Sequence, residues 1–467
     1  MMKKPAVFLP GLLALFACLP ALAAAPGNLK VGAAKVDITP ASDPAIPPTG
    51  KYEHEHLYVR AIVLDTGSAR AALIGADQAN LPELVWTAAS KQIAQELDCP
   101  VANIIISATH THSGWGPGQT YRGGPPPVPN PNAPPPPVVA KIVDAVSQAK
   151  AQLQPARMGF GTGFSYLNVN RDSIDPETHL WTQAPSLDAF SDKTVAVLKF
   201  ETPEGVPIAA YIDYAMHPVN GYLSGFVSAD FAGATSRWVE QAYGDKMIAV
   251  FVQGASGDQN PLYLRAATNV LASRGGVPVT GNVLTREKIE APVRDEKVTV
   301  QPPDPKLRDS LEQVMQAEGI LLGEEVIRVM TNTTRTEASP AIVAGQDVVT
   351  CPGRHRLDNT REGTPGNYTD GDPVHIRLGA LRIGDVALAS VNAEIYSTIA
   401  RRLKERSPMA NTVVVTLANG AANSGYIPND ASFGAYTFQV LSSRLKPGCA
   451  ESAIDNGLLD LIQADEK

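Results

Sequence analysis

Residues 83–116 read ELVWTAASKQIAQELDCPVANIIISATHTHSGWG, and this stretch indicates the fold class of the 467-residue chain. Apolar side chains recur at helical spacing over residues 83–98, and residues 103–107 (NIIIS) form a short β-branched run typical of a buried strand. A helix that leads into a buried strand is the basic step of an α/β fold. Histidines and small residues then follow the end of that predicted strand.

The same alternation of strands and helices continues along the rest of the chain. We expect strands at residues 29–40, 57–66, 70–77, 194–200, 208–214, 247–252, 375–382, 385–391 and 411–417, and helices at 138–153 and 306–330 and near Asp230, Ala393 and Cys449. The predicted class is therefore α/β, with a mixed β-sheet core flanked by helices. Neither a linker nor an internal repeat is visible, so residues 29–467 are expected to form a single large domain.

Composition is that of an ordinary globular protein, with 44% hydrophobic and 18% charged residues and a net charge of −8. The absence of any basic block argues against nucleic acid as a partner. Residues 1–23 combine two lysines, an apolar run and small residues at the cleavage position, which predicts a signal peptide and a secreted or periplasmic protein. A membrane anchor, or a lipid anchor at Cys18, is the alternative. No later stretch is apolar enough for a transmembrane helix.

Removal of residues 1–23 would leave three cysteines, Cys99, Cys351 and Cys449, which allow one disulfide whose pairing the sequence does not reveal. Residues 117–138 are dominated by Pro, Gly and Asn and are not expected to form regular structure. Because this segment follows the histidine motif closely, we expect it to shape the mouth of a cleft. A solvated surface excursion is the alternative.

His110 and His112 stand two residues apart at the end of a predicted buried strand. Side chains alternate with a period of two in a strand, so both imidazoles are expected on one face. Thr111, Ser113 and Gly114 are small enough to leave that face open. Neutral imidazole is a good zinc ligand. Two hydrogen-bonding histidines at a strand end are the alternative interpretation.

Three further segments place polar residues just after apolar strands. His217 follows one strand in YAMHP, and Glu394 is the only acid at a predicted strand-to-helix junction, where the helix dipole favours a carboxylate. Residues 254–261 (GASGDQNP) form a predicted tight turn whose N–H groups could face a cleft. A structural histidine, an ordinary helix-start glutamate and a surface turn are the alternatives.

These segments, in this order, resemble the neutral/alkaline (non-lysosomal) ceramidase family. The resemblance runs from about residue 30 to the C-terminus, and its matching stretches are VGAAKVDITP, LYVRAIVLD, ATHTHSGWG, LNVNRD, AMHP, SADF, QGASGDQNP, SVNAEIYSTIARRL and NSGYIP. It implies an α/β catalytic domain that binds one zinc ion. The metal ligands that it implies are His110, His217, Glu394 and Tyr426.

The resemblance also implies that His112 and Arg171 line the active site, and it reveals two departures. Asn260 stands where the family carries the serine proposed as nucleophile, and an amide side chain is not a nucleophile at neutral pH. Asn260 is instead suited to donate a hydrogen bond to a developing oxyanion. We also expect no room in this chain for the C-terminal β-sandwich domain of the ceramidases.

The sequence therefore predicts a secreted, zinc-dependent hydrolase of an amide (N-acyl) bond in a small-molecule or lipid-like substrate. Zinc-activated water is the expected nucleophile, since that route needs no serine. One alternative is a catalytically silent, ceramidase-like protein that binds a sugar, lipid or peptide. Another is a two-metal enzyme of the amidohydrolase or metallo-β-lactamase type, which is less favoured because Ser113 and Gly114 follow His112 where a lactamase motif has an Asp-His pair.

Overall fold

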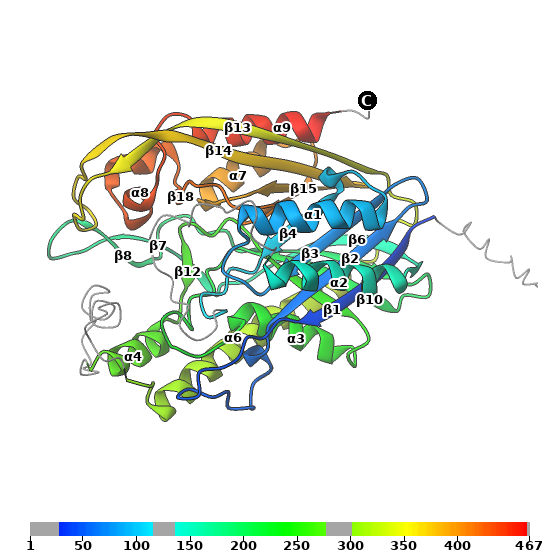
Figure 1. Cartoon of the computed structure of the whole chain (residues 1–467), viewed down its shortest axis with the longest axis horizontal. Coiled ribbons are helices and arrows are strands. Elements are labelled where there is room, and N and C mark those ends of the chain that lie inside the picture. Colours follow the sequence, from blue (N-terminus) through cyan, green and yellow to red (C-terminus); the bar gives the residue numbers. More distant parts are fainter. Residues whose placement is uncertain (1–27, 115–135, 277–300, 465–467) are drawn as a thin grey trace, which may run out of the picture.

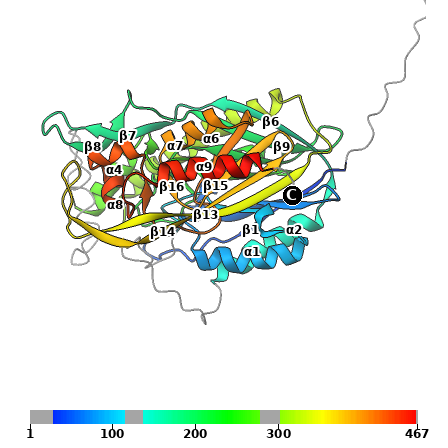
Figure 2. The same cartoon turned by 90° about the horizontal axis from the view of Figure 1, so that it is seen from above.

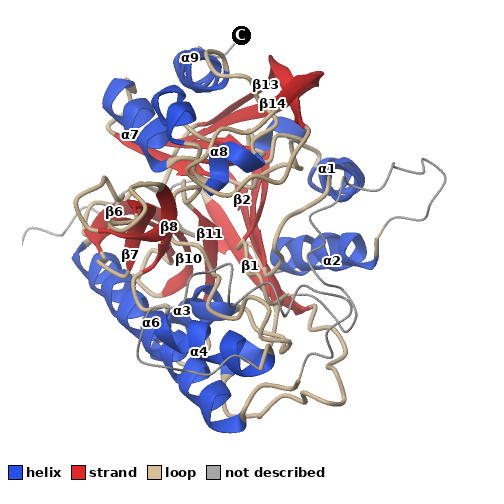
Figure 3. Cartoon of the chain, turned by 90° about the vertical axis from the view of Figure 1, so that its left-hand side faces the viewer, coloured by secondary structure: helices blue, strands red, loops and turns tan. Residues whose placement is uncertain are grey.

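Strands gather at the centre of the molecule and helices lie outside them (Figure 3). This computed structural model describes residues 28–114, 136–276 and 301–464. The fold is α/β with mixed sheets, as the sequence predicts. The predicted signal peptide and residues 117–135 of the Pro-rich segment lie outside the described residues; the last residues of that segment, 137–138, begin a helix.

The first sheet comes from the N-terminal part of the chain and has the spatial order β4-β3-β2-β1-β5. Its strands are β1 (Lys30–Asp37), β2 (Tyr58–Asp65), β3 (Arg70–Ala76), β4 (Ile104–Ala108) and β5 (Gln154–Pro155). Helix α1 (Glu83–Leu97) connects β3 to the parallel strand β4, and α2 (Pro137–Ala151) packs beside α1. The apolar faces of both helices cover one side of this sheet.

The second sheet has the order β11-β10-β9-β6. Its strands are β6 (Arg157–Phe164), β9 (Thr194–Glu201), β10 (Pro207–Tyr214) and β11 (Ile248–Gln253). Helix α3 (Asp230–Ala242) connects β10 to the parallel strand β11, and the long helix α6 (Pro305–Asn332) packs against α3. A short helix, α4 (Arg265–Arg274), lies against α6.

The third sheet has the order β13-β14-β15-β17. Its strands are β13 (Ile342–Arg356), β14 (Tyr368–Ile383), β15 (Val386–Val391) and β17 (Asn411–Val415). Helix α7 (Ser397–Arg406) connects β15 to the parallel strand β17, and α9 (Ala450–Gln463) lies over this sheet (Figure 2). Two small sheets complete the fold: β12 (Gln259–Pro261) with β7 (Asn168–Ile174) and β8 (Trp181–Ser186), and β16 (Glu394–Ile395) with β18 (Tyr426–Ile427).

The three large sheets share one chain path that no sequence repeat reveals. Each has an antiparallel strand pair, then a helix, then a strand parallel to the second of the pair: β2-β3-α1-β4, β9-β10-α3-β11 and β14-β15-α7-β17. Their inner faces meet in one apolar core. Such a path requires only the right hydrophobic pattern, so the three units need not share residues. Segments that follow parallel strands are the usual location of binding sites in α/β folds.

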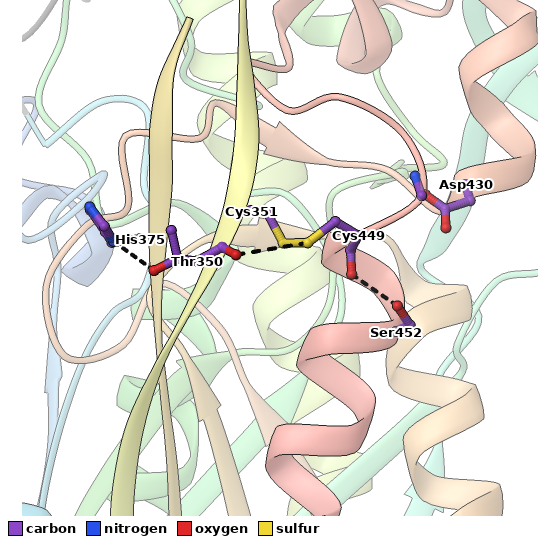
Figure 4. Close-up of a disulfide and its surroundings, with 7 residues drawn as sticks. Thr350, Cys351, His375, Asp430, Cys449 and Ser452 are labelled. Atoms are coloured by element: carbon purple, nitrogen blue, oxygen red, sulfur yellow. Dashed lines mark hydrogen bonds between the residues drawn. A yellow bond between two sulfur atoms is a disulfide. The ribbon is translucent and has the colours of Figure 1, made fainter.

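A disulfide joins Cys351 in β13 to Cys449, the residue before α9 (Figure 4). It joins two residues that are 98 positions apart in the sequence and so ties the C-terminal helix to the outermost strand of the third sheet. Cys99 is a free, half-buried thiol. The structure thus selects one of the pairings that the sequence left open.

Three local expectations need correction. The helix expected near Ala393 begins at Ser397, so Glu394 lies in the short strand β16 rather than at a helix N-terminus. Strand β4 ends at Ala108, so the two histidines lie in the following turn and not on the strand. Strands β7, β8 and β13 were not expected, and neither was β6, whose alternating glycines resemble a loop. These glycines are needed for close packing: a Cβ at Gly159 would lie 2.9 Å from Cγ2 of Thr333.

Candidate metal centre

His110 is held by the backbone that follows β3. Its own φ of 71° is in the left-handed region, which turns the chain sharply just beyond β4. Its backbone N–H donates to the carbonyl oxygen of Gln78 (2.9 Å), and its Nδ1 lies 2.5 Å from the carbonyl oxygen of Ala79. The backbone therefore fixes the ring through Nδ1, and Nε2 is the ring atom that can bind a ligand.

His217 follows β10 and is held in the same way by the segment after β11. Its Nδ1 lies 2.7 Å from the carbonyl oxygen of Ser256 and 3.1 Å from that of Gln259. A carbonyl oxygen can only accept, so Nδ1 carries the hydrogen and Nε2 carries a lone pair in both His110 and His217. Metal-binding histidines commonly have this second hydrogen bond to a carbonyl.

Glu394 and His112 complete a tight cluster around these two nitrogen atoms. The Nε2 atoms of His110 and His217 each lie 3.2 Å from Oε2 of Glu394. His112 places its Nε2 3.2 Å from Nε2 of His110, and the ligand atoms of the three imidazoles lie within 4.8 Å of one another. Lone pairs that converge at such distances repel one another unless a cation or a proton lies between them.

Burial keeps the imidazoles of His217 and His112 neutral. Loss of solvent, followed by the charge of Arg171, lowers the pKa of His217 to about 3. Loss of solvent and the neighbouring His110 and His217 lower the pKa of His112 well below its usual range. Neutral imidazole is the form that binds a metal ion, so the environment prepares these rings for that role.

Tyr426 reaches the cluster through the pairing of two short strands. Strands β16 and β18 pair in parallel with Glu394 directly opposite Tyr426, which places the tyrosine ring 6.2 Å from that of His217, centroid to centroid. The guanidinium carbon of Arg171 lies 5.1 Å from the centre of the Tyr426 ring. Figure 1 shows β7, β12 and β18 on the same side of the molecule.

Arg171 and Asn260 lie on neighbouring strands at the edge of the cluster. Strand β7 carries Arg171 and pairs with β12, which carries Asn260. Nη1 of Arg171 donates to Oδ1 of Asn260 (3.2 Å), and Nη2 donates to the carbonyl oxygen of Gly257 (2.5 Å). Arg171 is 4% exposed, so its charge acts in a poorly solvated place.

The structure thus brings together all seven residues that the sequence singled out: His110, His112, Arg171, His217, Asn260, Glu394 and Tyr426. The three-imidazole group includes His112, whereas the family resemblance places Glu394 and Tyr426 with His110 and His217 as ligands. We favour the set with Glu394, because its carboxylate oxygen lies equally close to both anchored imidazoles.

Sequence reasoning missed two residues that support this centre. Tyr222 packs edge-on against the ring of His112, with centroids 5.4 Å apart. Asp172 accepts hydrogen bonds from the Tyr396 hydroxyl (2.6 Å) and from Nε2 of Gln439 (2.8 Å), which braces the strand that carries Arg171. Their positions five residues after His217 and next to Arg171 were the only available signal.

Known proteins are similar in sequence to part of the chain. Residues 46–273 match the family described as neutral/alkaline non-lysosomal ceramidase, N-terminal. The chain is therefore similar to the neutral/alkaline ceramidases over this stretch. It is 29% identical to neutral ceramidase B of Dictyostelium discoideum over 170 residues and 27% identical to neutral ceramidase A of the same organism over 224 residues. These matches cover 34% and 44% of this chain but only 24% and 31% of the two ceramidases.

Solved ceramidase structures share the fold over most of the chain. A structure described as ceramidase complexed with C2 superposes with a TM-score of 0.66 at 16% identity, over 93% of this chain and 75% of its own. Neutral ceramidase from Pseudomonas aeruginosa gives a TM-score of 0.63 at 16% identity, over 93% and 74%. The ceramidase fold is thus preserved although few residues are shared. None of the helices in the described part of this chain has the length and apolar character of a membrane span.

Proposed function

We propose that this chain is a zinc-dependent hydrolase that cleaves the amide (N-acyl) bond of a ceramide-like lipid. The observation that carries the proposal is the pair of anchored imidazoles, His110 and His217, whose Nε2 atoms both lie 3.2 Å from the Glu394 carboxylate. The family match and the names of the related proteins, which are neutral ceramidases, support the substrate class. Residues 29–467 would carry the activity, and residues 1–23 would direct export.

The donor set fits zinc better than it fits a hard cation. Zinc binds imidazole nitrogen and carboxylate oxygen in four-coordinate sites, whereas calcium and magnesium prefer oxygen alone. His110, His217 and Glu394 would hold the ion, with Tyr426 as the fourth protein group and His112 beside it. When bound, zinc polarises a carbonyl oxygen and makes water more acidic.

Asn260 would act as a fixed hydrogen-bond donor rather than as a nucleophile. Its Oδ1 accepts from Nη1 of Arg171, so the orientation of the carboxamide is set and its Nδ2 is directed away from the guanidinium. An amide N–H held in this way can stabilise negative charge that develops on a substrate carbonyl oxygen. Arg171, which the Gly257 carbonyl also holds, would keep that donor in place.

Metal analysis followed by a substrate panel tests the proposal. The purified protein should contain about one zinc per chain. It should hydrolyse N-acyl sphingosines of several chain lengths, lose that activity on treatment with a chelator, and regain it when zinc is added. Simple N-acyl amides and esters in the same panel define the bond that is cleaved. A protein that binds no zinc, or that cleaves only esters, would contradict the proposal.

Asn260 also favours a second candidate, a catalytically silent relative that retains the binding site. Such a protein would bind zinc and a ceramide-like lipid but would turn over no member of the panel. The variant Asn260→Ser separates the two candidates. Activity that appears only in this variant identifies the natural protein as silent, whereas activity in the unaltered protein identifies an enzyme.

A further inference from the structure

A second buried polar cluster includes a residue of the segment that follows His217. Asp230 opens α3, Glu318 lies in the middle of α6, and Asn220 belongs to the segment that follows His217. All three members of the cluster are at most 2% exposed. Nδ2 of Asn220 donates to Oδ1 of Asp230 (3.0 Å) and to Oε2 of Glu318 (2.7 Å), so the amide joins the two carboxyl groups.

The two carboxyl groups differ in how many hydrogen bonds they accept. Asp230 accepts two further bonds from backbone N–H groups, of Gly221 (3.1 Å) and Phe231 (2.7 Å), and these bonds oppose the rise that burial causes in its pKa. Among the described residues, Oε1 of Glu318 and Oδ1 of Asn220 have no hydrogen-bond partner. Buried polar atoms are nearly always paired, so these two orphaned acceptors in adjacent groups require an explanation.

No positive charge of the described residues compensates Glu318. The residues one turn away on α6 are uncharged: Val314, Met315, Leu321 and Leu322. Across the interface the charged group that faces Glu318 is Asp230. Burial lowers the pKa of His54, which also packs on α6, to about 4 and so keeps it neutral. Arg274, on α4, instead donates to the carbonyl of Leu223.

We propose that Glu318 holds a proton at neutral pH and is a positioning residue for the metal centre, because its O–H donates to Oδ1 of Asn220. A single proton then satisfies both orphaned atoms and completes a two-bond acid–amide pair with the existing Nδ2–H···Oε2 bond. Burial, with the charge of Asp230 as the next cause, raises the pKa of Glu318 well above its ordinary value of 4.5.

The segment fixed in this way, residues 217–224, bears directly on the metal centre. The carbonyl of Pro218 accepts from the backbone N–H of His112 (3.1 Å), and Tyr222 packs against the His112 ring. Gly221 touches Ser113 so closely that a Cβ could not fit there. A shift of Asn220 would therefore move His112, and through it the imidazole cluster. The activity readout below rests on the proposed function, but the stability readout does not.

The pH dependence of stability tests the proton. A buried acid whose pKa is raised contributes its full stability below about pH 4.5, and that contribution is lost as pH rises towards the folded-state pKa. Glu318→Gln supplies the same donor and acceptor without titrating. Its thermal midpoint should equal that of the natural protein near pH 4.5 and exceed it by a growing margin as pH rises to 8. Glu324→Gln, at an exposed position of the same helix, should show no such margin.

Glu318→Ala tests the positioning role. It removes one of the two carboxyl groups that hold Asn220 and leaves only the bond to Asp230, so zinc should dissociate faster and kcat should fall, whereas Glu318→Gln should retain both values. A lower thermal midpoint for Glu318→Gln at pH 8 would overturn the proposal. So would stabilisation of the natural protein, but not of Glu318→Gln, by added calcium or magnesium, since the cluster would then bind a cation. Equal zinc dissociation in all variants would also refute the positioning role.

Discussion

Two buried polar clusters of this protein differ in how their charges are satisfied. Around Glu240 on α3, opposite charges surround one another: the carboxylate accepts from Arg60 (3.0 Å), Lys35 (2.6 Å) and Arg237 (2.6 Å). Arg60 also donates to Asp77 (3.1 Å). Every charge has a partner of opposite sign within the chain, which is the condition under which buried charges are tolerated.

The imidazole centre has the same burial but no such internal balance. The Nε2 atoms of His110 and His217 face one carboxylate oxygen of Glu394. None of these three atoms can donate a hydrogen bond to another while Nδ1 of each ring holds the hydrogen. Burial alone therefore does not distinguish structural from functional polar groups. A cluster that satisfies itself supports the fold, whereas one whose lone pairs converge is prepared for a ligand.

Removing a ligand from the imidazole centre should have the largest effect. His217→Ala deletes one of the two anchored nitrogen donors, so bound zinc should fall from about one per chain to near zero, and hydrolysis should be lost with it. Atomic absorption on dialysed protein measures the metal. His375→Ala is the matched control, because His375 is exposed on β14 and away from the centre. Full zinc occupancy in His217→Ala would remove His217 from the ligand set.

Breaking the ion cluster should instead reduce stability. Glu240→Ala leaves Arg60 buried with only Asp77 as partner, and such a loss costs about 3–5 kcal/mol. Urea unfolding provides the measurement. Glu53→Ala removes a half-exposed partner of Arg237 and should cost less than about 1 kcal/mol. If Glu240→Ala cost no more than this control, the cluster would not hold the fold. Zinc content of the folded fraction should be unchanged in both variants.

A substitution of Asn260 tests the proposed hydrogen-bond donor at the edge of the imidazole centre. Asn260→Ala should lower kcat about 10²–10³-fold, which is what one oxyanion donor contributes. Zinc content should not change, because the side chain bonds to Arg171 and not to the imidazoles. Steady-state rates on a cleaved N-acyl substrate give the value. Complete loss of turnover with zinc still bound would mean that Asn260 has a different role.

Asp213 is a buried carboxyl group, and its Oδ2 has no hydrogen-bond partner in the part of the chain that the structure describes. Burial raises its pKa from 3.8 to about 7, although the charge of Lys404 opposes the shift. Stability should therefore fall as pH rises from about 4 to about 7, by at most about 1.4 kcal/mol per pH unit. Asp213→Asn should flatten this slope in unfolding experiments, and Asp188→Asn, at an exposed position, should not. An unchanged slope in Asp213→Asn would assign the pH dependence to other groups.

Local sequence patterns predicted most of the elements but not all of them. The helix expected at residues 83–98 and the strand at 103–107 are found at Glu83–Leu97 and Ile104–Ala108, because the spacing of apolar residues records which face is buried. Strands β6, β7, β8 and β13 were not predicted. In β6, glycines alternate with other residues. Its glycines are present because α6 approaches closely, and this is a contact between segments more than 150 residues apart.

In the candidate site, too, local sequence predicted some features, whereas others depend on contacts between distant segments. Residue chemistry alone singled out His110, His112 and His217, and the family resemblance added Tyr426 and Arg171. Period-two alternation did not bring the two motif histidines together, since they lie in a turn with φ of 71° at His110. Glu394 was expected for its place at a helix N-terminus, but a parallel strand pair with β18 positions it.

The sequence by itself determined the α/β class, the strand-end histidines and the resemblance to ceramidases, because hydrophobic spacing and ligand chemistry are properties of short segments. Only the tertiary structure decided which polar groups meet. The pairing of Cys351 with Cys449, the approach of Glu394 to both imidazoles and the contact of Glu318 with Asn220 each join distant segments. Such contacts depend on how three sheets close around one core, and that closure depends on the packing of the whole chain.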